Sequence, residues 1–98
     1  MRDLNQWRER FAKAALREDV EGHLVREVLS FKTAGGTEAE AEKLIRDLWS
    51  VSSQGTERAP LDGVFETVYD AVVGNCATTN HLFREDFEES DYYRPIPA

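Results

Sequence analysis

At 98 residues, 41% of them hydrophobic, the chain is long enough to bury one core and too short to build two. Its single cysteine excludes an internal disulfide. The sequence contains neither the apolar run of about 20 residues that spans a membrane nor the apolar core of a signal peptide. We therefore expect one cytoplasmic domain without membrane attachment.

Charge is distributed unevenly along the chain. Residues 1–34 carry seven Lys or Arg against six Asp or Glu, whereas residues 35–98 carry five against thirteen, for a net charge of −7 overall. A surface with such an excess of acids repels nucleic acid and attracts basic proteins. The sequence therefore predicts a basic protein as partner and no direct contact with nucleic acid.

Two amphipathic stretches begin the chain. The first is expected to form a helix from about Asp3 to Leu16. The second has its apolar positions at Val20, Leu24, Val28 and Phe31. This second stripe is rotated by roughly a quarter turn from the first, so that the chain either breaks or curves continuously. We favour a break near Asp19, which is a good N-cap residue.

The third helix has the clearest local signal in the sequence. Ala34-Gly35-Gly36 is expected to end the second helix, and Thr37 with Glu40 forms a capping-box pattern that begins the third. The apolar positions of this third helix continue to about Val51. Residues 52–59 are polar and are predicted to form a loop.

The fourth stretch, from Leu61 to Cys76, is the most apolar and is predicted to be the most buried helix of the fold. Pro60 precedes it, and Gly74-Asn75 offers a place to end it. Cys76 lies on the apolar face of this pattern, so we expect a buried thiol that packs as a small hydrophobic side chain.

The opposite face of this helix carries an acidic ladder, Asp62, Glu66 and Asp70, spaced four residues apart. Like charges at this spacing destabilise a helix by a few tenths of a kcal/mol per pair, so an offsetting interaction is expected. The ladder either faces basic residues of the first helix or faces a basic partner. The basic residues in question are Arg10, Lys13 and Arg17.

The C-terminal residues combine acids with aromatic rings. Five acids lie between residues 85 and 91, and Phe83, Phe87, Tyr92 and Tyr93 lie among or beside them. Some of these rings are expected to pack on the core and the others to serve as anchors for a partner. Asn80 could also cap a fifth short helix through Leu82, Phe83 and Phe87.

These patterns together predict an all-α fold, a small four-helix bundle with no β-sheet. Residues 1–82 are the predicted bundle domain. Residues 83–98 form an acidic, aromatic tail that packs partly on the domain.

Signals for catalysis are weak. Cys76 has only His81 nearby in sequence, and His23 has no apparent second metal ligand. All-α nucleotide pyrophosphatases are similar in size and acidity and use paired E-x-x-E and E-x-x-D motifs on helices. Glu18-x-x-Glu21 and Glu88-x-x-Asp91 match these letters, but the first falls at the expected helix break and the second in the tail. We predict no catalytic residue, no metal site and no cofactor.

The leading hypothesis is a small acidic binding protein that neutralises a basic partner, most simply a bacterial toxin-immunity protein whose toxin could be a nuclease. The alternatives are an all-α metal-dependent nucleotide hydrolase that uses the acidic ladder, and a phage-encoded inhibitor or nucleic-acid mimic. The predicted partner-binding residues are the acids and rings of the two acidic regions, namely Asp62, Glu66, Asp70, Glu85, Asp86, Phe87, Glu88, Glu89, Asp91, Tyr92 and Tyr93.

Overall fold

The computed structural model describes residues 3–52, 62–76 and 78–97, and it has the predicted all-α architecture. Within these residues there is no β-strand, and the chain forms four α-helices and two short 3-10 helices. Their bounds are α1 Leu4–Ala14, α2 Val20–Thr33, α3 Glu38–Ser52, α4 Asp62–Val73, η2 Thr78–Asn80 and η3 Glu89–Asp91. The prediction of a small four-helix bundle is confirmed.

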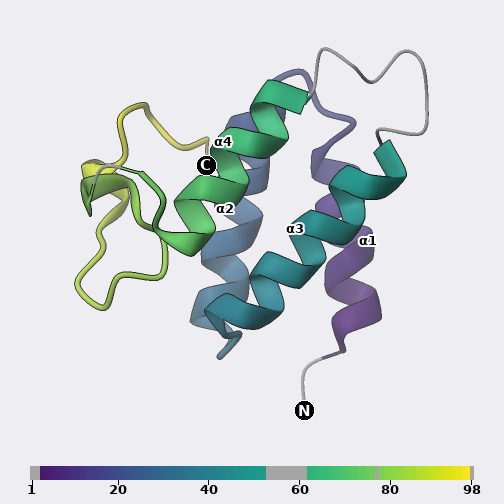
Figure 1. Ribbon diagram of the computed structural model, residues 1–98, viewed down its shortest axis with the longest axis horizontal. Coiled ribbons are helices and arrows are strands. Elements are labelled where there is room, and N and C mark those ends of the chain that lie inside the picture. The colour runs from purple at the N-terminus through teal and green to yellow at the C-terminus, as the bar shows by residue number, and fades with distance from the viewer. Residues whose placement is uncertain (1–2, 53–61, 77, 98) are drawn as a thin grey trace.

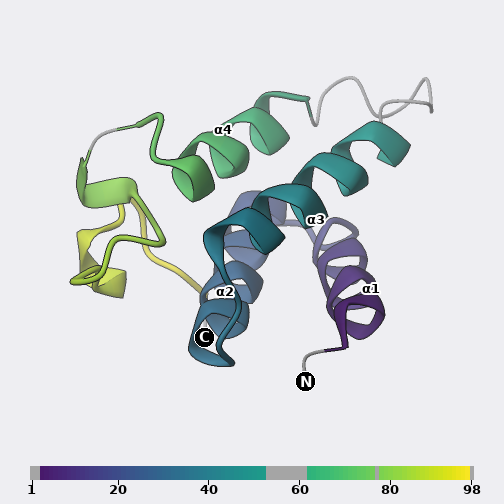
Figure 2. The same ribbon diagram turned by 60° about the horizontal axis from the view of Figure 1, so that its bottom comes forward.

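The four helices form two layers (Figures 1 and 2). One layer pairs α1 with α2, and the other pairs α3 with α4. Between the layers, α2 packs on α4 and α1 packs on α3, which closes the bundle around a single core. The C-terminal residues leave the end of α4 and lie on the side of the bundle away from α1 (Figure 2).

Local caps explain why the first two helices are separate. Asp3 accepts hydrogen bonds from the backbone N–H groups of Asn5 and Gln6 and so caps α1. Asp19 accepts one from the N–H of Gly22 at 3.1 Å and caps α2. The predicted break near Asp19 is therefore confirmed. The first helix ends at Ala14, two residues before the predicted end at Leu16.

The start of α3 has the predicted capping box. The Thr37 hydroxyl accepts from the N–H of Glu40 at 3.2 Å, and the Glu40 carboxylate accepts from the N–H of Thr37 at 3.0 Å. Just before it, Gly35 adopts a left-handed φ of 96° and the N–H of Gly36 donates to the carbonyl of Phe31 at 2.8 Å. This glycine-dependent pattern satisfies the last carbonyls of α2.

The core is built from one apolar face of each helix. An edge-to-face cluster of Trp7, Phe11 and Phe31 joins α1 to α2, with ring centres 5.2–6.4 Å apart. Phe65 and Val68 of α4 are fully buried, so the apolar face predicted for that helix is confirmed. The remaining fully buried large side chains are Leu24, Val25, Val28, Leu44, Ile45, Val72 and Leu82.

The expectation that residues 61–76 form the most buried helix is wrong in two respects. First, α2 has six buried residues and α4 has four, because α2 packs on all three other helices. Second, α4 ends at Val73, and Leu61 lies outside the described residues. Gly74, with a φ of 84°, turns the chain out of the helix before Cys76, which is therefore exposed rather than buried.

The expected fifth helix between Asn80 and Phe87 is also wrong. Those residues instead run in an irregular path that combines local turns, such as the hydrogen bond from the N–H of Phe87 to the carbonyl of Arg84, with hydrogen bonds to other elements. Lys32 Nζ of α2 donates to the carbonyl oxygens of Leu82 and Arg84, both at 2.9 Å, and the N–H of Leu82 donates to the carbonyl of Ala71. Because these tertiary hydrogen bonds replace those of a helix, the segment needs no regular structure.

Among the described helices, none combines the length and the apolarity needed to cross a membrane. The predicted loop at residues 52–59 lies mainly outside the described residues, as does Pro60.

Candidate functional site

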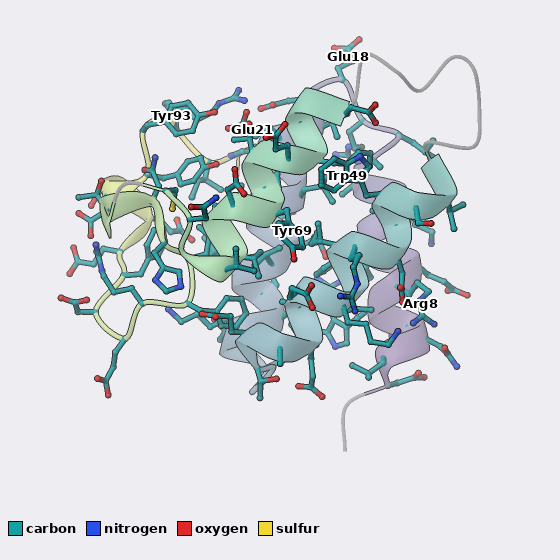
Figure 3. The ribbon with its side chains drawn as sticks, in the orientation of Figure 1. Arg8, Glu18, Glu21, Trp49, Tyr69 and Tyr93 are labelled. Carbon is teal, nitrogen blue, oxygen red and sulfur yellow. The ribbon has the colours of Figure 1, made fainter. Side chains whose placement is uncertain are left out.

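The C-terminal segment, residues 78–97, is attached to the start of α2. Arg94 forms an ion pair with Asp19 at 3.0 Å. The phenol of Tyr92 donates to the Glu21 carboxylate at 3.2 Å, and that of Tyr93 donates to the same carboxylate. Figure 3 shows Tyr93 beside Glu21. The segment is thus fixed by groups more than seventy residues away in sequence.

The two tyrosines differ in what they expose. Tyr92 is 6% exposed and belongs to the core, whereas Tyr93 is 58% exposed. Burial, followed by the charge of Glu21, raises the pKa of Tyr92, and burial with the hydrogen bond to Glu21 raises the pKa of Tyr93 to about 12. Both phenols therefore stay protonated and donate to the carboxylate. Tyr92 is a structural anchor here, and Tyr93 presents its ring to solvent.

Both cations of this segment are already paired with acids. Arg84 forms ion pairs with Asp91 at 2.6 Å and with Asp86 at 2.8 Å. Arg94 contacts Glu21 at 3.9 Å in addition to its pair with Asp19. As a result, the positive charge of the segment is neutralised locally.

Three acids remain without a cation. Glu85, Glu88 and Glu89 are exposed, and no ion pair joins them to any other described residue. They lie in sequence around Phe87, which is half-buried and packs against the core. The outward charge of the C-terminal segment is therefore negative.

Two shallow hollows lie between this segment and α2. The first, of about 280 Å³, is lined by Leu29, Lys32, Thr33, Phe87 and Glu89. The second, of about 290 Å³, shares Leu29, Thr33 and Glu89 with the first. Lys32 lies 5.6 Å from the centre of the Phe87 ring, and burial followed by the charge of Arg84 lowers its pKa. Each hollow thus combines apolar side chains with the carboxylate of Glu89 and with one cation, Lys32 in the first and Arg26 in the second.

The acidic ladder of α4 forms a separate surface. Asp62 and Glu66 are exposed, and Asp70 is half-buried. Asp62 accepts a hydrogen bond from the Trp49 indole at 3.1 Å, and Asp70 contacts the Asn75 amide at 3.5 Å. α1 packs on α2 and α3 rather than beside α4, and its Arg10 pairs with Glu27 of α2. The structure therefore does not place the ladder against the basic side of the first helix.

Two of the residues that match the hydrolase motifs, Glu21 and Asp91, accept hydrogen bonds within the fold. Glu21 accepts from Tyr92 and Tyr93, and Asp91 accepts from Arg84. Glu18 is exposed at the turn between α1 and α2 (Figure 3). In the part of the chain that the structure describes, no group of three or more His, Cys, Asp or Glu residues is arranged to hold a metal ion.

Cys76 and His81 are not arranged as a nucleophile and its base. His81 Nε2 contacts the Glu38 carboxylate of α3 at 2.9 Å. Partial desolvation and the nearby charge of Asp70 raise the pKa of the Cys76 thiol, which disfavours the reactive thiolate.

The sequence alone did not identify a further group of residues, on α1 and α2, as a possible site. Arg10, Lys13 and Arg17 line a hollow together with His23 and Arg26 of α2. Arg10 and Lys13 are three residues apart and lie on one side of α1, which is a signal available in the sequence, whereas Arg17 lies in the turn after that helix. What the sequence does not reveal is that α2 adds two more nitrogen-bearing side chains to the same hollow.

Comparison of the chain with protein families, with curated proteins and with solved structures gives no match. Function must therefore be inferred from the surfaces themselves.

Proposed function

We propose that this protein binds a basic protein partner through its C-terminal acidic segment and neutralises that partner, in the manner of a bacterial toxin-immunity protein acting in the cytoplasm. The observation that carries the proposal is that the two arginines of this segment are paired with acids, whereas three of its acids are paired with no cation. Arg84 and Arg94 are both held in ion pairs, while Glu85, Glu88 and Glu89 are exposed without cations.

The shape of the surface supports a contact with basic side chains. A lysine or arginine can lay its aliphatic stem along Leu29 and Phe87 while its charged end meets Glu89, all of which line the first hollow. Lys32 lines this hollow as well, but its Nζ is held by the carbonyl oxygens of Leu82 and Arg84. Tyr93 presents an exposed ring whose hydroxyl is already held by Glu21. A ring fixed in this way loses little conformational entropy on binding, which favours affinity.

The segment is also preorganised as a whole. Its contacts with Asp19, Glu21 and Lys32 of α2 and its N-cap exist in the free protein. Since an interface that is already ordered avoids the cost of folding on binding, the acidic surface can dock with little rearrangement.

Affinity capture from cells of the source organism tests the proposal. The wild-type chain is compared with Glu85→Lys/Glu88→Lys and with a matched control, Glu9→Lys/Glu18→Lys, whose two acids are exposed on or after α1 and carry the same charge change. We expect one basic protein to be retained by the wild type and by the control and to be lost from the first variant. With the purified partner, the association rate should fall steeply as salt rises, while the dissociation rate changes less.

Neutralisation is tested separately by expressing the captured partner in bacteria. The partner alone should arrest growth, and co-expression of the wild-type chain should restore it. The proposal fails if the C-terminal variant and the control retain the partner equally well. It also fails if the chain binds the partner without restoring growth.

A further inference from the structure

A second charged surface lies on the layer formed by α1 and α2. It shares only Arg26 with the hollows beside the C-terminal segment. Here a hollow of about 170 Å³ is lined by Arg10, Lys13, Ala14, Arg17, His23, Arg26 and Glu27. The lining contains four permanent cations and only one carboxylate. Such a local excess of positive charge stands out in a chain whose net charge is −7.

The one carboxylate is already used. Glu27 accepts a hydrogen bond from Arg10 Nε at 2.7 Å, and the guanidinium of Arg10 lies 4.1 Å from the centre of the Trp7 ring. Hydrogen bond and ring contact together fix Arg10 at the side of the hollow. Glu27 therefore neutralises Arg10 and leaves the other cations unbalanced.

The side chains of the remaining cations have no partner within the described part of the chain. Those of Lys13, Arg17 and Arg26 make neither a hydrogen bond nor an ion pair there, and all three residues are exposed. The chain has nineteen acidic residues against twelve Lys and Arg, so a shortage of carboxylates does not explain this. An anion can therefore bind these side chains without displacing an ion pair that the fold already makes.

We propose that this hollow binds the phosphate group of a small ligand. Guanidinium groups match the oxygen geometry of phosphate, and a phosphate places two negative charges on one centre, as a compact cluster of cations requires. The volume of about 170 Å³ is below the range of roughly 300–1,000 Å³ typical of pockets for drug-sized ligands. The hollow therefore recognises mainly the anionic group, and the rest of the ligand extends into solvent.

Titration of the full-length ¹⁵N-labelled chain by NMR tests the proposal. The probes are inorganic phosphate and phenyl phosphate, each added at constant ionic strength, so that free phosphate is distinguished from a phosphate ester. We expect saturable shifts confined to backbone amides of residues 10–17 and 23–27. Arg17→Gln/Arg26→Gln should bind about tenfold more weakly or worse, because two charged contacts are removed.

A matched control removes two charges elsewhere. Lys43→Gln/Arg46→Gln changes exposed cations of α3 that pair with Asp47 and Glu42, and it should bind the probes like the wild type. Since Arg17 and Arg26 are exposed and unpaired, the test variant should retain the wild-type melting temperature, and a melting curve establishes that it is folded.

Four results would overturn the proposal. They are the absence of saturable shifts, equal weakening by the two double variants, shifts of the same size with acetate, and binding of a short single-stranded DNA at this hollow without binding of either phosphate probe. The acetate result would indicate a general attraction for anions. The DNA result would indicate a nucleic-acid backbone as the ligand instead of a small molecule.

Discussion

One carboxylate, that of Glu21, accepts hydrogen bonds from two consecutive phenols. Tyr92 donates to it at 3.2 Å and Tyr93 also donates to it, while Arg94 lies 3.9 Å away. A protonated phenol donates to a carboxylate, whereas a phenolate is repelled by it. The protonated tyrosines therefore contribute to the attachment of the C-terminal segment to α2, beside the Arg94–Asp19 ion pair and the hydrogen bonds of Lys32.

The stability of the fold should decline at alkaline pH for this reason. The pKa of Tyr93 is raised to about 12 from an ordinary value near 10, so its contribution is complete below about pH 10 and is lost as pH rises through about 12. Tyr93→Phe keeps the ring but cannot ionise. Urea unfolding at pH 9 and at pH 12 should show the advantage of the wild type over Tyr93→Phe shrinking. A constant difference would indicate that Tyr93 is not held by Glu21.

Gly22 is a residue where a single added methyl group should lower the stability of the fold. A Cβ at this position would lie 2.3 Å from Asp19 Oδ2 and 2.9 Å from Pro97 Cδ. Gly22→Ala must therefore displace the cap of α2 or the end of the C-terminal segment. We expect it to lower the free energy of unfolding by about 1 kcal/mol or more, although alanine is the better helix former.

Gly63→Ala is the matched control for this substitution. No atom lies within 4 Å of a Cβ built at Gly63 of α4, so alanine should stabilise the fold there by roughly 0.5–1 kcal/mol. Chemical denaturation of the two variants measures both effects. Stabilisation by both substitutions would show that the C-terminal segment does not pack closely on Gly22.

At the scale of elements, the capping box of α3 offers a direct test of local sequence chemistry. Thr37→Ala removes the hydroxyl that accepts from the N–H of Glu40 and should cost on the order of 1 kcal/mol. Thr67→Ala, which removes a hydroxyl bonded to the Gly63 carbonyl within α4, should change stability by less than about 0.5 kcal/mol. Equal midpoints for Thr37→Ala and the wild type would contradict the cap.

The elements that could be predicted from the sequence are those whose apolar face and first residue depend on residues a few positions away in the chain. Apolar spacing located the four helices, and Asp19 and Thr37 located two of their starts, because a cap bonds to an N–H only three residues away. Cys76 was misplaced because a helical pattern was continued past Gly74. The fifth helix was wrongly expected because the Leu82 carbonyl, in the segment after Asn80, accepts a hydrogen bond from Lys32, fifty residues earlier in the chain. The sequence carries no local signal for that contact.

The candidate site was also predictable only in part: its acids could be located from the sequence, but most of their contacts could not. The acids of residues 85–91 were identified from composition, and Glu85, Glu88 and Glu89 are indeed exposed. The burial of Tyr92 and the ion pair of Arg94 with Asp19 depend on contacts with α2 that only the folded chain defines. The ion pairs of Arg84 with Asp86 and Asp91 depend on the irregular path of the segment itself. Whether these acids bind a partner stays a prediction.

For the whole molecule, the C-terminal segment is part of the fold and not an appended tail. Tyr92 is buried, Leu82 is fully buried, and the segment is joined to α2 through Asp19, Glu21 and Lys32. This arrangement closes the side of the bundle away from α1 (Figure 2). The exposed acids and the buried side chains of the segment therefore alternate within one stretch of chain, residues 82–92.

A chain ending at Leu82 should consequently be less stable than the intact protein. It loses the burial of Tyr92, worth roughly 1.5–3 kcal/mol for a large side chain, together with the ion pair of Arg94. Urea unfolding should show a midpoint well below that of the intact chain. A chain ending at Tyr93 separates the two contributions, because it retains the buried ring and lacks only the last residues. If truncation after Leu82 leaves the midpoint unchanged, the segment does not contribute to the core, and the preorganised acidic surface proposed above does not exist in solution.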